Sequence, residues 1–230
     1  LGDPLYRAPR LEEALAEHNR APDLDPRMAA AHCNRGNVLC ELRRFPEALE
    51  AFDRAIEIDV TDALAHHNRG NVLGILGRPA EAVEELNRAI ELDPENAAAH
   101  YNCGVALRAL GRLERALAEF KRTIELDPKK AKAYTACGNV LFQLGRHAEG
   151  VLAYEQRLEL DPGKGAALND VAWLLAACVD ESVRNPARAV ELAKRAVAAA
   201  PEAWHMRNTL GVALYRAGEL RESLVALGES

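Results

Sequence analysis

The polar and apolar residues between positions 63 and 76 divide into two faces when they are plotted at the helical spacing of about 100° per residue. The two faces consist of Leu64, His67, Asn68, Asn71 and Ile75 and, opposite them, His66, Arg69, Leu73 and Leu76. Gly77-Arg78 interrupts this pattern, Pro79 suits the first turn of a new helix, and Asp93-Pro94 ends that helix. The pattern therefore predicts two helices joined by a short turn.

Glycines and prolines recur with a period of 34 residues, as from Gly36 to Gly70 (70 − 36 = 34). Three phases share the period, and they are marked by Gly36, Gly70, Gly104 and Gly138, by Gly77, Gly111 and Gly145, and by Pro94, Pro128 and Pro162. Because each period contains one predicted helix pair, the sequence predicts an all-α fold built from 34-residue helix-turn-helix repeats.

In this register, we expect residues 1–230 to form a single solenoid. The expected full repeats cover 29–62, 63–96, 97–130 and 131–164, a repeat with a five-residue insertion covers 165–203, and partial repeats cover 1–28 and 204–230. The insertion follows from the spacing of Pro162 and Pro201 (201 − 162 = 39), and we assign it to residues 179–184. The partial repeats at both ends suggest a segment of a longer protein.

The third repeat resembles the tetratricopeptide repeat family. The residues that carry the resemblance are His100, Cys103, Gly104, Leu107, Ala116, Phe120, Thr123 and Pro128. The resemblance implies a right-handed superhelical solenoid in which small residues let paired helices approach closely and first helices line a concave groove. Arg157 departs from the pattern because it takes a phase held by alanine in earlier repeats. This junction is a candidate for a loosened or re-angled solenoid, and the alternative, which we favour, is a stem that packs while its charge reaches solvent.

The groove that the resemblance implies would be lined mainly by amides. Its predicted peptide-binding residues are Asn34, Asn37, His67, Asn68, Asn71, Tyr101, Asn102, Lys132 and Asn139. An asparagine side chain both donates and accepts hydrogen bonds, so amides at one-repeat intervals can hold an extended peptide. Asn34, Asn68 and Asn102 resemble the asparagine ladder of the O-linked N-acetylglucosamine transferase (O-GlcNAc transferase) family. The alternative is that these asparagines are only solvated helix positions.

Two tryptophans stand apart from the amides. Trp173 falls in a groove phase and Trp204 begins the last helix pair, so each could anchor a partner or pack in the core.

The net charge of −6 gives no reason to expect nucleic-acid binding. Glu41 and Asp170 are the acids that we count on the predicted first helices, so the groove is expected to be neutral to mildly basic and to favour a neutral or acidic peptide. Acids on second helices are expected to pair at i,i+4 spacing, as in Glu50 with Arg54. Five cysteines without a CxxC pair predict free thiols and a cytoplasmic location, and no apolar run is long enough to predict a membrane span.

We predict no catalytic, cofactor-binding or metal site, and no enzyme activity. His32, His66 and His100 are 34 residues apart, which is typical of packing residues in a repeat rather than of metal ligands, and Cys103 and Cys137 share one repeat phase as buried thiols. The predicted function is a protein-interaction scaffold of a bacterial type. The alternatives are a regulatory or substrate-docking region of a larger enzyme, similar to repeat regions fused to kinases or glycosyltransferases, and a solenoid that self-associates through its terminal helices.

Overall fold

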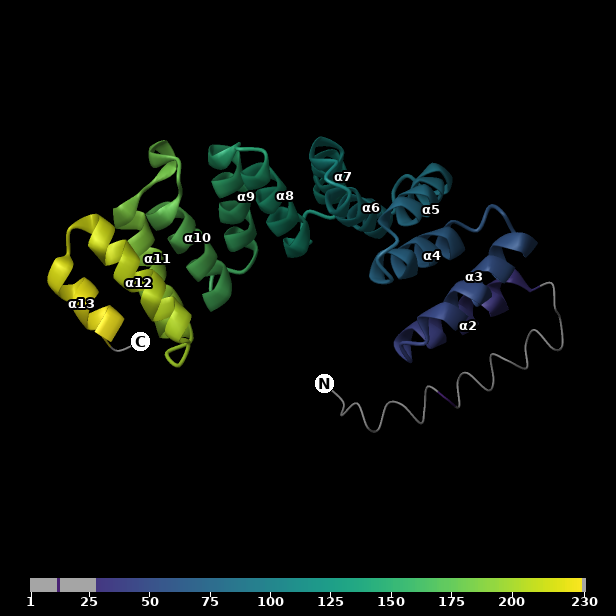
Figure 1. Ribbon diagram of the computed structural model, residues 1–230, viewed down its shortest axis with the longest axis horizontal. Helices are drawn as coiled ribbons and strands as arrows, with labels where there is room; N and C mark the ends of the chain where they lie inside the picture. The colour runs from purple at the N-terminus through teal and green to yellow at the C-terminus, as the bar shows by residue number, and fades with distance from the viewer. Residues whose placement is uncertain (1–11, 13–27, 229–230) are drawn as a thin grey trace. The chain divides into compact units, whose positions relative to one another are not determined.

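The computed structural model describes residue 12 and residues 28–228. All regular elements in these residues are helices, and they contain no β-strand (Figure 1). The prediction of an all-α fold built from helix pairs is therefore confirmed. Most of the partial repeat expected over residues 1–28 lies outside the described residues.

The chain divides into two compact units, Leu1–Leu126 and Asp127–Ser230. The described part of unit 1 consists of three helix pairs, each of which folds back on itself (Figure 1). The pairs are α2 (Ala29–Glu41) with α3 (Phe45–Ile58), α4 (Ala63–Ile75) with α5 (Pro79–Leu92), and α6 (Ala97–Ala109) with α7 (Leu113–Leu126).

Unit 2 continues the same alternation. Its pairs are α8 (Ala131–Gln143) with α9 (His147–Leu160), α10 (Gly165–Ala177) with α11 (Pro186–Ala199), and α12 (Trp204–Ala217) with α13 (Leu220–Gly228). A 3₁₀ helix, Glu181–Val183, lies between α10 and α11, within the segment to which the spacing assigns the inserted residues.

The core of each pair in unit 1 forms where a large side chain of the second helix lies directly on a glycine of the first helix. Phe52 lies on Gly36, Leu86 on Gly70 and Phe120 on Gly104. These three large side chains are almost completely buried. The small residues at this phase thus allow the close approach of the paired helices that the sequence predicts.

The turn inside each of the three pairs of unit 1 contains a residue with a left-handed backbone conformation. Gly77 adopts φ = 74° in the turn between α4 and α5. Arg43 holds the same phase one repeat earlier (77 − 43 = 34) and adopts φ = 59°. A side chain in this conformation clashes with its own backbone, at a cost of about 1–2 kcal/mol, whereas glycine avoids the clash.

Arg43→Gly is therefore expected to stabilise unit 1 by about 0.5–1 kcal/mol, because the exposed Arg43 side chain loses little on removal and the turn strain is relieved. Urea titration followed by circular dichroism measures this change. Arg43→Ala keeps the strained φ and serves as the control. Equal effects of the two variants would contradict the strain explanation.

Two histidines join the paired helices of unit 1 through second-helix carboxylates. His66 Nδ1 lies 2.7 Å from Glu85 Oε2, and His100 Nδ1 lies 2.7 Å from Glu119 Oε2. The other ring nitrogen of His66 lies 3.2 Å from the Val60 carbonyl oxygen. Both histidines are buried, as expected for packing residues, and each one also serves as a polar bridge between the helices.

Arg69 completes the bridge at His66. Its guanidinium lies 2.6 Å from Glu85 Oε1 and 2.5 Å from Asp53 Oδ1. The Glu85 side chain is only 21% exposed, so it meets two partially desolvated donors. Removal of its charge would leave both donors poorly satisfied.

Glu85→Gln is expected to destabilise unit 1 by about 1–3 kcal/mol, because hydrogen bonds to charged groups contribute in this range. The adjacent Glu84 is exposed, and Glu84→Gln is the matched control, with an expected change within about 0.5 kcal/mol. Thermal unfolding of both variants provides the comparison. A Glu85→Gln variant as stable as Glu84→Gln would contradict a stabilising role for the bridge.

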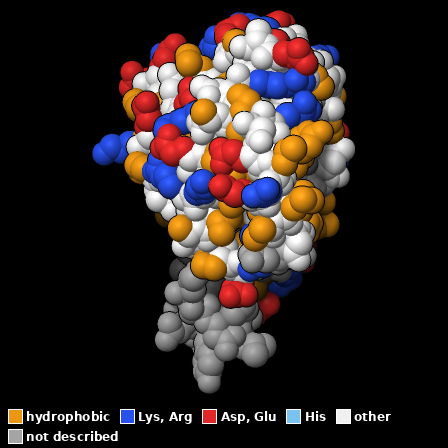
Figure 2. All heavy atoms as spheres, turned by 90° about the vertical axis from the view of Figure 1, so that its left-hand side faces the viewer, with side chains coloured by type: hydrophobic (Ala, Val, Ile, Leu, Met, Phe, Trp, Pro, Cys, Tyr) orange, Lys and Arg blue, Asp and Glu red, His pale blue; other side chains and the backbone are white. Residues whose placement is uncertain are grey.

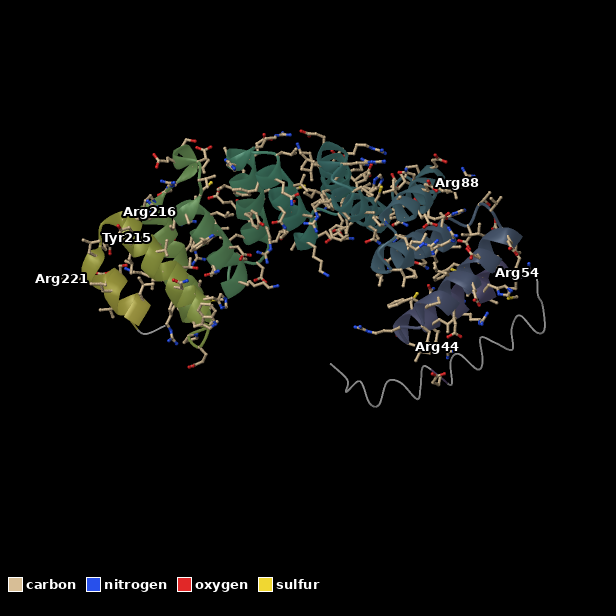
Figure 3. The ribbon with its side chains drawn as sticks, in the orientation of Figure 1. Arg44, Arg54, Arg88, Tyr215, Arg216 and Arg221 are labelled. Atoms are coloured by element: carbon tan, nitrogen blue, oxygen red, sulfur yellow. The ribbon has the colours of Figure 1, made fainter. Side chains whose placement is uncertain are left out.

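Most exposed ion pairs within the second helices have i,i+3 spacing, although Arg195 contacts Glu191 at the expected i,i+4 spacing, at 3.7 Å. Arg54 contacts Glu57 at 2.7 Å and Arg88 contacts Glu91 at 2.9 Å (Figure 3). The expected i,i+4 pairing of Glu50 with Arg54 was therefore wrong, because the Arg54 side chain extends toward the later residue. Such exposed pairs contribute little to stability.

Candidate functional site

The structure places most of the predicted peptide-binding residues on the first helices of unit 1. The residues are Asn34 and Asn37 on α2, His67, Asn68 and Asn71 on α4, and Tyr101 and Asn102 on α6. Asn34 and Asn71 are exposed, and the others are partly buried. Lys132 and Asn139 lie on α8 of unit 2.

Side-chain hydrogen bonds join neighbouring first helices of unit 1. Asn68 Nδ2 donates to Asn37 Oδ1 at 2.8 Å, and Asn102 Nδ2 donates to His67 Nε2 at 3.0 Å. In the part of the chain that the structure describes, no group donates to the Oδ1 of Asn68 or Asn102, and the Asn34 and Asn71 side chains make no hydrogen bond. The amides thus brace adjacent helices and keep acceptors for a ligand.

The remaining predicted site residues have packing contacts. The Tyr101 ring lies against Phe120, with 5.7 Å between ring centroids. In unit 2, Tyr154 donates its hydroxyl hydrogen to Asn139 Oδ1 at 2.7 Å, and the Lys132 side chain is exposed. Asn139 thus offers a ligand mainly its amide N–H groups, because its oxygen already accepts a strong hydrogen bond.

A hollow of about 200 Å³ opens between α4 and α6, and residues of α5 also line it. Its polar lining residues are Asn71 and Asn102, and its apolar lining residues are Gly70, Gly74, Ile75, Pro79, Ala82, Leu86, Val105, Ala106 and Ala109. Ile75 is 56% exposed and Val105 is 37% exposed, so both present apolar surface to a ligand. The hollow therefore combines an apolar floor with two amides.

Sequence reasoning predicted Asn102 but missed the apolar α6 residues of this hollow. Val105 and Ala109 follow Asn102 at i+3 and i+7, which places all three on one face of a helix. That spacing was the available signal. Val105 and Ala109 are apolar, whereas the predicted peptide contacts all carry a polar group, so the helical spacing alone did not identify them.

Three thiols of unit 1 are poor nucleophiles. Burial raises the pKa of Cys33 and of Cys40 to about 11, and it raises the pKa of Cys103 to about 12. All five cysteines of the chain are free thiols. Because the thiolate is the reactive form, these positions are suited to packing rather than to covalent chemistry.

Alkylation of Cys103 by iodoacetamide at pH 8 is expected to be about a thousandfold slower than that of the unfolded chain, because its pKa rises from 9.0 to about 12. Mass spectrometry with and without urea measures the two rates. Equal rates would contradict the burial of this thiol.

The described residues contain no group of three or more His, Cys, Asp or Glu side chains that could hold a metal ion. No helix among them is long and apolar enough to cross a membrane. Figure 2 shows the molecule with the left-hand side of Figure 1 facing the viewer. Acidic, basic and apolar side chains are interspersed on this face.

Comparison with known proteins agrees with the repeat pattern. Two family models, both described as tetratricopeptide repeat, match residues 67–131, 108–167 and 174–230 and residues 27–95. No curated protein matches the sequence.

Three solved structures illustrate the likeness of fold. YrrB, described as a TPR protein with an unusual peptide-binding site, is 24% identical, with a TM-score of 0.68 over 87% of this chain and 97% of that chain. PilW, described as a type IV pilus biogenesis factor, is 22% identical, with a TM-score of 0.72 over 89% of this chain and 93% of that chain. Pseudomonas aeruginosa pilF is 22% identical, with a TM-score of 0.68 over 87% of this chain and 88% of that chain.

Proposed function

Because the chain belongs to the tetratricopeptide repeat family, we propose that it is a non-catalytic scaffold that binds an extended protein segment on the first-helix face of unit 1. The observation that carries this proposal is the hollow between α4 and α6, with Asn71 and Asn102 beside exposed Ile75 and Val105. An apolar side chain of the segment enters the hollow, and the amides bond to its backbone. The description of YrrB as a peptide-binding protein is consistent with this role.

Charge in unit 1 favours a neutral segment over a strongly charged one. Arg69 is one of the bases of the first helices, but Asp53 and Glu85 already neutralise it. The hollow itself is lined by no charged side chain. An acidic segment therefore gains less from this face than the base count of the first helices suggests.

The free thiols support a reducing compartment such as the cytoplasm.

The proposal is tested by capture of partners from the source lysate with the wild-type chain and with Val105→Arg, which fills the hollow from α6. Val60→Arg is the matched control, because Val60 is 59% exposed and does not line the hollow. We expect a partner retained by wild type and by Val60→Arg, but bound at least about tenfold more weakly by Val105→Arg. Circular dichroism verifies that all three are folded.

The amides are tested separately by Asn71→Ala and Asn34→Ala, whose side chains make no hydrogen bond within the described residues. Loss of the same partner from Asn71→Ala alone would place the segment at the hollow. Loss from both variants would extend the binding face to α2. A partner retained equally by Val105→Arg and by both asparagine variants would exclude this face.

A further inference from the structure

A second hollow, of about 340 Å³, lies wholly within unit 2, between α10 and α12. Its lining residues are Tyr154, Asn169, Asp170, Trp173, Leu174, Trp204, His205, Asn208 and Thr209. Trp173 is 44% exposed and Trp204 is 64% exposed, although tryptophan is a highly buried residue type on average. Of the two roles left open for these residues, the structure thus favours the surface role over core packing.

The hollow contains a carboxylate that is incompletely compensated. Arg157 Nη1 lies 3.3 Å from Asp170 Oδ2, which is a long contact for an ion pair. Burial raises the pKa of Asp170, and the nearby charges of Arg157 and His205 do not fully offset it. The Arg157 side chain is only 14% exposed and faces Asp170, so it packs as expected and its charge also meets a carboxylate.

The other polar groups around Asp170 add hydrogen-bond acceptors. Asn169 Oδ1 is buried without a hydrogen-bond partner in the described structure, and Asn208 offers a second amide oxygen. The lining includes no Lys or Arg, so His205 is its one titratable base. Indole rings attract cations to their faces, and a guanidinium group stacks on them particularly well.

We propose that this hollow binds an arginine side chain of a partner protein, with the guanidinium stacked on Trp204, the more exposed of the two tryptophans, and hydrogen-bonded to Asp170. Charge complementarity selects this occupant, because a carboxylate and two tryptophans line the hollow, its lining includes no Lys or Arg, and the contact of Arg157 with Asp170 is long. The site is independent of the peptide face of unit 1, since it lies in the other unit and prefers a cationic group. A partner with a neutral segment and a separate arginine could use both.

The chain contains its own reporter for this test, because Trp173 and Trp204 are its only tryptophans. The full chain is titrated with the capped peptide acetyl-Gly-Arg-Gly-amide, and tryptophan emission is recorded. The matched probe has citrulline, which keeps the shape of arginine without its charge. We expect the arginine peptide to bind at least about tenfold more tightly than the citrulline peptide, with an advantage that shrinks as salt is added.

Two variants test the named residues. Asp170→Asn is expected to abolish the preference for arginine over citrulline, whereas Glu159→Gln, at an exposed carboxylate on α9, keeps it. Because Asp170→Asn also leaves Arg157 without its partner, Trp204→Leu provides a test that keeps this pair, with binding followed by the emission of Trp173. We expect it to weaken arginine-peptide binding at least about fivefold.

Three results would overturn the proposal. They are equal binding of the arginine and citrulline peptides by the wild-type chain, unchanged arginine binding by Trp204→Leu, and no saturable change up to about 10 mM arginine peptide. None of these results bears on Val105→Arg or Asn71→Ala, so the two binding sites stand or fall separately.

Discussion

Phe120→Ala is expected to destabilise unit 1 by about 3–5 kcal/mol, which is the usual cost of removing a fully buried phenylalanine ring. The Phe120 side chain is 0% exposed, and it lies close to α6 at Gly104 and to the Tyr101 ring. Because glycine has no side chain to move into the space, the cavity cannot close from that side. The loss should therefore fall in the upper half of the range.

Urea titration measures the loss, and hydrogen exchange locates it, with the amides of α6 and α7 expected to lose most protection. Leu64→Ala is the control, because Leu64 is 51% exposed in the same unit and its removal should change stability by no more than about 0.5 kcal/mol. A Phe120→Ala variant that loses less than about 1 kcal/mol would show that this ring does not hold α6 and α7 together.

The period of the sequence predicted the helix pairs because each repeat puts the same residue types into the same environment. The first helices α2, α4, α6 and α8 begin 34 residues apart, each at an alanine. The phase of Gly104 predicted a close helix approach, and the family models confirm the repeat type. These features are local in sequence and recur every 34 residues, so comparison of neighbouring repeats is enough to recognise them.

The hydrogen bonds that the asparagine amides make to one another could not be predicted from the repeat pattern. Asn68 donates to Asn37, which lies 31 residues away on another helix, and this contact depends on the angle between successive pairs. A helical wheel gives the direction of a side chain on its own helix but not its distance from the next one. The wheel placed the asparagines together, but it could not reveal which of their donors were already used.

Two other contacts involve residues that the sequence marks separately. Asp170 is one of the acids that we count on the predicted first helices, and Arg157 takes a phase that alanine holds in earlier repeats. Their ion pair joins α9 to α10, and nothing in the repeat pattern links these two departures. Likewise, His66 and Glu85 recur as His100 and Glu119, so the constant spacing of 19 residues was a usable signal for the bridge between paired helices.

Gly104→Ala is expected to destabilise unit 1 by about 2–3 kcal/mol, although alanine is the better helix former. A Cβ at this position would lie 2.6 Å from Phe120 Cε1 and 2.8 Å from Phe120 Cδ1. The ring is completely buried, so relief requires α6 to move away from α7. Thermal and urea unfolding measure the loss.

Gly74→Ala is expected to have the opposite sign, at a glycine of α4 that lies one turn after Gly70, the repeat equivalent of Gly104. An added Cβ there meets no atom within 4 Å, so only the helix propensity changes, and a gain of about 0.5–1 kcal/mol is expected. The double variant Gly104→Ala, Phe120→Leu should be more stable than the sum of the single effects predicts, since the smaller side chain makes room for the Cβ. Additive losses would contradict direct contact between Gly104 and Phe120, and a destabilised Gly74→Ala would show that glycine is needed in α4 for another reason.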